Sequence, residues 1–284
     1  MPPSHAESRL SRSAGHPIGH ALELKFLKSR LLPPVVLFSA VLAVSAVHPL
    51  ARARPASDSS RRTGATGMPE PHSGSLLVHF YESYLKDQDV DTFRQNVWTR
   101  YTEGTLARLV DAPDPQTRRS AIFALGLSGT YAVNAPVAKA LRDPDPTVRR
   151  IADMALWAIW FRADTPENNT TLEQVRELIN KQRLEDAIAL ATRLIERSPQ
   201  FAEAYNQRAI AEFFLGRFKE SAQDCRKVVE RNPYHTGALS GLANCQIRLD
   251  KRESALETLR RAAKIQPYSA DIRQLILAIE SGER

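Results

Sequence analysis

Apolar residues recur three and four positions apart along most of residues 76–284. Ala121, Ala124 and Leu125 follow this spacing in one segment. Residues spaced in this way lie on one face of an α-helix and form a stripe that packs against neighbouring helices. The pattern predicts a succession of amphipathic helices and an all-α fold.

Three prolines divide the second half of this region at a constant interval. Pro199, Pro233 and Pro267 lie 34 residues apart, and each closes a helical stretch of similar design. A helix pair of this length cannot bury its apolar face alone, so stacked neighbours bury it together. The period predicts an α-solenoid of helix-turn-helix repeats, an architecture that mostly holds other proteins.

A different repeat precedes this one. Residues 106–126 and 137–157 are offset by 31 residues and are identical at nine positions. Asp114 and Asp145 suit N-cap positions, and the prolines that follow them suit the first helical position, where a missing N–H costs nothing. Each half therefore predicts a helix, a tight turn and a second helix.

The phrase D-P-D-P-x-V-R-R-x-A-x-x-A-L at 143–156 resembles the short HEAT-like repeats first described in bilin lyases. The resemblance covers two units. It implies that Asp114 and Asp145 pair with Arg118 and Arg149 between neighbouring units, as structural contacts.

Two further helices are expected before these units. Residues 76–85 place Phe80 and Tyr84 four positions apart, and residues 90–101 continue the helical spacing. These helices are expected to cap the open end of the stack. The HEAT-like region is therefore predicted to span 76–165.

The middle 34-residue unit resembles the tetratricopeptide repeat. It has Tyr205 at the first large position, Ala209 at the small position of the first helix and Gly216 in the inter-helix turn. The first unit departs from this pattern, because Gln182 replaces the turn glycine. A capping helix follows the third unit. The domain is predicted at 166–284, with units at 168–201, 202–235 and 236–269 and the capping helix at 270–279.

By resemblance, the units form a right-handed superhelix whose concave face is lined by the first helix of each unit. That face mixes aromatic, aliphatic, amide and basic side chains. It suits an extended or helical peptide, because aromatic residues anchor and amides satisfy peptide groups. For Phe213 and Phe214, packing against the second helix or the next unit is the alternative. The predicted partner-binding residues are Arg176, Asn206, Ile210, Phe213, Phe214, Asn244, Ile247 and Arg248.

One subtype of this family is not predicted. Members that clamp the carboxylate tails of heat-shock chaperones use a lysine–asparagine pair on the first helix. The corresponding positions here are Leu172 and Arg176.

The N-terminal residues have the pattern of a targeting signal. A 13-residue apolar run at 35–47 follows three basic residues, as in a secretory signal, and is short for a membrane span of about 20 residues. Residues 1–53 are predicted to be a signal peptide or an N-terminal membrane anchor, and 54–75 a disordered linker. The expected location is outside the cytoplasm, in the periplasm or cell envelope, with the membrane touched only through an uncleaved N-terminal segment.

The distribution of charge and the lack of catalytic motifs argue against nucleic-acid binding and catalysis. Most of the net charge of +7 comes from residues 1–75, so the repeats are nearly neutral and a nucleic-acid surface is not expected. The chain has no phosphate-binding loop, nucleophile elbow or CxxC motif. We therefore expect no catalytic, cofactor-binding or metal site. Cys225 and Cys245 are expected to be small buried hydrophobes, with a disulfide bond as the minority alternative.

Together these features predict a non-catalytic scaffold for a protein or peptide partner. The short join at 163–169 predicts that the two arrays stack into one curved rod. Two alternatives stay open at this point: a lyase-like enzyme or enzyme subunit acting on a bound chromophore, and a self-assembling cell-envelope protein.

Overall fold

The computed structural model describes residues 73–281, and every regular element in that range is helical, which confirms the all-α prediction. The predicted signal or anchor lies outside the described residues. No helix between residues 73 and 281 is long and apolar enough to cross a membrane. The elements are α3 (Ser73–Asp87), α4 (Val90–Trp98), α5 (Glu103–Leu109), α6 (Pro115–Ser128), the 3-10 turn η2 (Tyr131–Val133), α7 (Asn134–Lys139), η3 (Ala140–Arg142), α8 (Pro146–Phe161), α9 (Pro166–Asn180), α10 (Leu184–Arg197), α11 (Ala202–Phe214), α12 (Phe218–Arg231), α13 (Thr236–Arg248), α14 (Arg252–Ile265) and α15 (Ala270–Glu280).

The first array runs from α3 to α8. Helices α6 and α8 pack against each other, and α3 and α4 cover α6, as expected of a cap. Aromatic rings fill the space under this cap: the centroid of Phe123 lies 4.7 Å from that of Tyr84 and 5.2 Å from that of Phe93. Helix α3 begins at Ser73, so its first turn falls inside the segment that was expected to be a linker.

The second array consists of three antiparallel pairs, α9–α10, α11–α12 and α13–α14, with α15 packed on the last pair. Its 34-residue period is visible in the backbone. Gln182, Gly216 and Asp250 occupy the same turn position with φ of 59°, 76° and 57°. Glycine tolerates this left-handed conformation without strain, whereas glutamine and aspartate are disfavoured there. The first pair is therefore a genuine repeat unit although it lacks the turn glycine.

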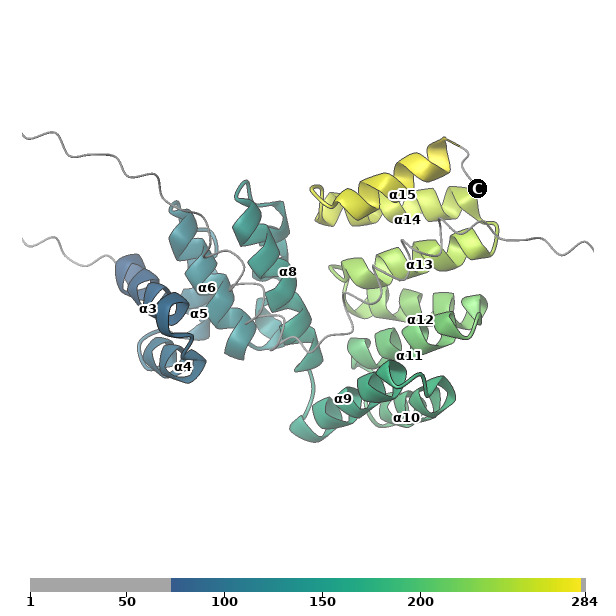
Figure 1. The fold of residues 1–284 in the computed structure, drawn as a ribbon, viewed down its shortest axis with the longest axis horizontal. Helices are drawn as coiled ribbons and strands as arrows, with labels where there is room; N and C mark the ends of the chain where they lie inside the picture. The colour runs from purple at the N-terminus through teal and green to yellow at the C-terminus, as the bar shows by residue number, and fades with distance from the viewer. Residues whose placement is uncertain (1–72, 282–284) are drawn as a thin grey trace, which may run out of the picture.

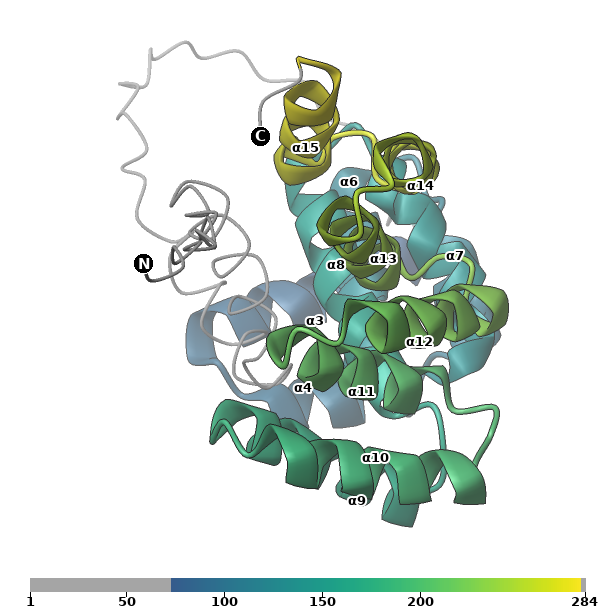
Figure 2. The ribbon, with the colours of Figure 1, turned by 90° about the vertical axis from the view of Figure 1, so that its right-hand side faces the viewer.

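The two arrays do not form one continuous rod, and this expectation was wrong. Figure 1 shows the α3–α8 array beside the α9–α15 stack, and Figure 2 shows the same arrangement from the side. Thr165 caps α9 and Pro166 occupies its first turn, so the chain changes direction over a few residues. The tail of α8 then packs against α11, and its last residue, Phe161, also contacts α9.

Candidate partner-binding face

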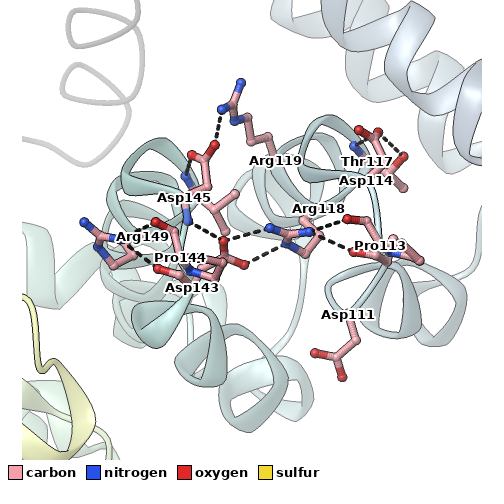
Figure 3. Close-up of polar contacts among 12 residues, drawn as sticks. Asp111, Pro113, Asp114, Thr117, Arg118, Arg119, Asp143, Pro144, Asp145 and Arg149 are labelled. Atoms are coloured by element: carbon pink, nitrogen blue, oxygen red, sulfur yellow. Dashed lines mark hydrogen bonds and ion pairs between the residues drawn. The ribbon is translucent and has the colours of Figure 1, made fainter.

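The repeated acidic and basic residues of the first array are used by the fold (Figure 3). Asp114 and Asp145 are N-caps, as predicted: Asp114 accepts the backbone N–H of Thr117 at 2.8 Å. Arg118 makes a two-point ion pair with Asp143, with N–O distances of 2.7 and 2.8 Å.

The pairing between units differs in detail from the expectation. Arg118 reaches Asp143 rather than Asp145, and Asp145 pairs instead with Arg119. Arg149 donates to the main-chain oxygens of Asp143 and Pro144, at 2.8 and 2.9 Å. All of these groups are engaged within the array, so their role is structural.

The first helices of the second array, α9, α11 and α13, form what is called here the first-helix face. It divides into two parts by what covers it. The seam half faces the tail of α8, and the open half lies toward the other ends of the three helices. The seam half comprises Leu172, Arg176, Glu203, Asn206, Gln207, His235 and Gly237; the open half comprises Ile210, Phe213, Phe214, Asn244, Ile247 and Arg248.

A buried hydrogen-bond network holds the seam half together. Glu203 accepts the side-chain amides of Asn206 and Gln207, each at 2.8 Å. Its second oxygen lies 2.9 Å from Nε2 of His235, and both side chains are fully buried. Nδ1 of His235 accepts the backbone N–H of Ala238 at 3.0 Å, so Nε2 carries the ring proton and donates to Glu203. The carboxylate thus receives three hydrogen bonds from its own domain.

Aromatic residues from α8 cover this network. The ring of Trp160 stacks on His235 with 4.2 Å between centroids, and Trp157 meets the same imidazole edge-on at 5.1 Å. A Cβ atom at Gly237 would lie 2.8 Å from Cζ2 of Trp157, closer than side chains can approach. A side chain at position 237 would force Trp157 to move, so the α8 tail packs closely against the face at this point.

Two of the predicted partner-binding residues lie under this cover. Arg176 is 7% exposed, pairs with Glu173 and places its guanidinium 5.3 Å from the ring centroid of Phe161. Asn206 is 3% exposed and donates to Glu203. The Asn206 amide is used within the chain, whereas Nε and Nη1 of Arg176 are buried without a hydrogen-bond partner. Asn244 is equally buried, at 5% exposed, so five of the eight predicted residues remain partly or fully exposed.

The open half keeps its side chains partly accessible, except that of Asn244, which is 5% exposed. Phe213 is half-buried, with its ring 5.3 Å from that of Phe218, and the Arg248 guanidinium lies 4.9 Å from the Phe218 ring centroid. Phe214 and Ile210 pack beside the α9–α10 pair, and both remain half-buried. The alternative for the two phenylalanines holds in part, because each packs internally and still exposes an edge.

Several buried oxygen atoms of α11 and α13 make no hydrogen bond within the described part of the chain. Two of them, Oδ1 of Asn244 and Oε2 of Glu212, lie in the C-terminal parts of these helices; the others are Gln207 Oε1, Thr236 Oγ1 and Gln246 Oε1. Burial raises the pKa of Glu212 to about 7, and the nearby charge of Asp224 adds to this shift. Arg208 opposes the shift but is already held by Asp224, with N–O distances of 2.6 and 2.9 Å.

Sequence reasoning missed the seam. His235 belongs to no recognisable sequence motif, yet it stands just before α13, where its imidazole accepts the backbone N–H of Ala238 and caps the helix. Trp157, Trp160 and Phe161 lie at the end of the first repeat type. The large size of these three side chains was the sequence signal that the end of α8 packs against another part of the protein.

Comparisons with known families cover both arrays. A family model for HEAT repeats matches residues 102–198. Two tetratricopeptide repeat models match residues 172–236 and 213–279. The HEAT match thus overlaps α9 and α10, but in the structure these helices pack mainly on each other and on α11 and therefore belong to the second array.

The similar proteins are repeat proteins too. A TPR repeat-containing protein of Rhizobium etli is 29% identical over 102 residues, which is 36% of this chain and 49% of that protein. Hsp70-Hsp90 organizing protein 1 of Glycine max is 29% identical over 100 residues, 35% of this chain and 18% of that protein. This chain thus spans about half or less of the curated relatives it matches.

A solved structure shares the helical architecture over part of the chain. The first TPR domain of Spaghetti (RPAP3), bound to an HSP90 peptide, matches 42% of this chain and 94% of its own length, with 22% identity and a TM-score of 0.41. The family matches carry the assignment. The chain is a repeat protein in which HEAT-type helices precede tetratricopeptide repeats.

Proposed function

We propose that this protein is a non-catalytic scaffold that holds a protein partner on the open half of the first-helix face. The observation that supports the proposal is that α8 covers one half of the first-helix face and leaves the other half uncovered. The seam half is filled by α8, whereas the open half combines half-buried apolar side chains, the exposed Arg248 and the unpaired acceptor Asn244 Oδ1.

The chemistry of this half fits a short peptide segment. Phe213 and Ile247 offer apolar contact area, which supplies most of the binding free energy at protein interfaces. Asn244 Oδ1 is buried and lacks a donor, and the main-chain N–H of a bound segment would satisfy it once the amide turns toward the surface. Because α8 takes the other half, the segment contacts the C-terminal ends of α11 and α13 rather than the whole face.

Related proteins support a protein partner in general. The Glycine max relative is named for organising Hsp70 and Hsp90. We do not extend chaperone binding to this chain, because the positions of the lysine–asparagine clamp are held by Leu172, which is fully buried, and Arg176, which is engaged with Phe161.

Site-specific photocrosslinking tests the proposal. A photoreactive phenylalanine analogue at position 248 is expected to crosslink a protein partner in the native cells. The same analogue at the exposed position Arg273 on α15 is the matched control. The crosslink is expected to disappear when the position-248 protein also carries Asn244→Ala.

Two outcomes contradict the proposal. Equal crosslinking from positions 248 and 273 would show that the open half is not the contact surface. A crosslink only to a second copy of the chain would favour self-assembly over partner binding.

We also propose that the N-terminal segment directs the repeats out of the cytoplasm. The support is the 13-residue apolar run at 35–47 behind basic residues. Cell fractionation with N-terminal sequencing of the purified protein tests this: a new N-terminus after residue 44 indicates cleavage, and an intact chain in the membrane fraction indicates an anchor. An intact chain in the cytoplasmic fraction contradicts the proposal.

A further inference from the structure

A cavity of about 310 Å³ lies at the seam between the two arrays. Its walls come from η2 and the end of α8 on one side and from the segments that precede α11 and α13 on the other. This volume is at the lower end of the range for ligand pockets, which often form where two domains meet. The lining residues are Tyr131, Trp160, Ala163, Gln200, Phe201, Ala202, Glu203, Arg231, Asn232 and His235.

Flat apolar side chains form much of the wall. Trp160 and Phe201 are each 2% exposed, and Tyr131 is 38% exposed. The Tyr131 hydroxyl donates to the main-chain oxygen of Arg231 at 3.2 Å, which ties the first array to the second beside the cavity. Such walls accept an aromatic ring or a large aliphatic side chain.

One buried polar group in the wall lacks a partner, and its orientation is fixed by a chain of hydrogen bonds. Trp160 Nε1 can only donate, and it donates to Asn134 Oδ1 at 2.8 Å. Asn134 Nδ2 must then donate to Asn232 Oδ1, at 3.0 Å. Nδ2 of Asn232 is left as a donor with no partner in the described residues, although the side chain is only 1% exposed. A buried donor without an acceptor costs about 1–3 kcal/mol, so the site favours a ligand that supplies one.

The charged side chains of the wall already use their hydrogen-bonding groups within the chain. The Glu203 carboxylate accepts from Asn206, Gln207 and His235. The Arg231 guanidinium donates to the main-chain oxygens of Pro199 and Lys227, at 2.9 and 3.0 Å. The neutral N–H of Asn232 Nδ2 is therefore the donor that a ligand would meet, and it suits a neutral acceptor such as a carbonyl oxygen.

We propose that this cavity binds an aromatic or large aliphatic residue of a peptide, whose main-chain carbonyl accepts a hydrogen bond from Asn232 Nδ2. The peptide identity of the ligand rests on the proposed scaffold function. The site is distinct from the open half, because its walls come from both arrays. It would give the scaffold a second anchor point that exists only while the two arrays are closed on each other.

The test uses the full-length protein and N-acetyl-L-phenylalaninamide, which carries one aromatic ring and two amide carbonyls. Saturation-transfer NMR is expected to show contact between the protein and the ring protons of this probe. N-acetyl-L-alaninamide, which lacks the ring, is expected to give no transfer.

Two variants locate the contact. Asn232→Asp keeps an acceptor oxygen for Asn134 and removes the free N–H donor. Ala163→Met fills the cavity from a half-buried position. Each is expected to reduce the transfer at least fivefold. Asn96→Asp makes the same charge change at a half-buried site in α4 and is expected to keep the signal.

The outcomes separate this proposal from the scaffold function. Thermal melting shows whether each variant is folded. If Asn232→Asp does not fold, Ala163→Met alone still tests the cavity site. Equal transfer in all variants, or none in the wild type, overturns the cavity site even if the position-248 crosslink persists. Probe binding without any position-248 crosslink would instead leave the cavity as a site and remove the scaffold proposal.

Discussion

Two glutamates of α11, nine residues apart, show how differently the two halves of the first-helix face are built. Glu203, in the seam half, is fully buried and accepts three hydrogen bonds. Glu212, toward the open half, is 9% exposed, and its Oε2 has no partner. The first carboxylate is fully hydrogen-bonded within the interior, while the second is buried just below the open half with one oxygen unsatisfied.

The difference arises from what covers each half. Trp157 and Trp160 close the seam half, and water can no longer satisfy the polar groups beneath them. The Glu203 carboxylate and the three donors that reach it are matched within the chain, although Gln207 Oε1 and two nitrogens of Arg176 have no hydrogen-bond partner there. The open half has no such cover, and the unmatched acceptors Glu212 Oε2 and Asn244 Oδ1 lie in the C-terminal parts of α11 and α13. Four substitutions test this contrast.

The largest effect is expected from Glu203→Ala. It removes one acceptor and leaves the buried donors of His235, Asn206 and Gln207 without a partner. Each buried donor left without a partner costs about 1–3 kcal/mol, so the free energy of unfolding is expected to fall by about 3 kcal/mol or more. Urea unfolding measures it, with the exposed Glu196→Ala as control. A loss below about 1 kcal/mol would show that the network does not stabilise the seam.

Gly237→Ala is expected to separate the arrays. The added methyl group would lie 2.8 Å from Trp157, so the tryptophan must move, at a cost of about 1–3 kcal/mol. Small-angle scattering should show a larger radius, and tryptophan emission should shift to the red. Gly104→Ala is the control, because the nearest atom to its added methyl is a flexible arginine tip 4.0 Å away. Identical scattering in the two variants would contradict the seam geometry.

Glu212→Gln tests the unmatched carboxyl. The pKa of Glu212 is raised from 4.5 to about 7, so between these pH values the folded chain binds more protons than the unfolded chain. Its contribution to stability is therefore complete below about pH 4.5 and is lost as pH rises through 7. Glutamine keeps the group neutral, and the variant should be about 1 kcal/mol more stable than wild type at pH 8, after allowance for screening by solvent.

Urea unfolding at pH 5 and pH 8 measures this effect. The gain should shrink toward pH 5, where the wild-type carboxyl is largely protonated. An equal gain at both pH values would mean that the pKa of Glu212 is not raised.

The smallest effect on stability is expected from Arg248→Ala in the open half. This exposed side chain loses its contact with the Phe218 ring, worth about 0.5–1 kcal/mol. Partner capture, in contrast, should fall by tenfold or more if the open half is the binding surface. A large loss of stability with unchanged capture would reverse the roles assigned to the two halves.

Much of the fold could be predicted because the repeats are local. The N-caps at Asp114 and Asp145 and the turn at Gly216 follow from backbone chemistry within a few residues. The eight predicted partner-binding residues were placed by the same register, yet Arg176 and Asn206 proved to be covered. Register assigns a residue to a face, but it does not say whether another part of the chain lies on that face.

The sequence by itself determined the helices, their two periods and the residues that each first helix turns outward, because these depend on contacts between neighbours along the chain. Only the tertiary structure decided that the first array lies beside the second, and that Trp160, His235 and Glu203 meet at a closed seam. Those contacts join residues dozens of positions apart through side chains that have no shared spacing, so no local pattern records them.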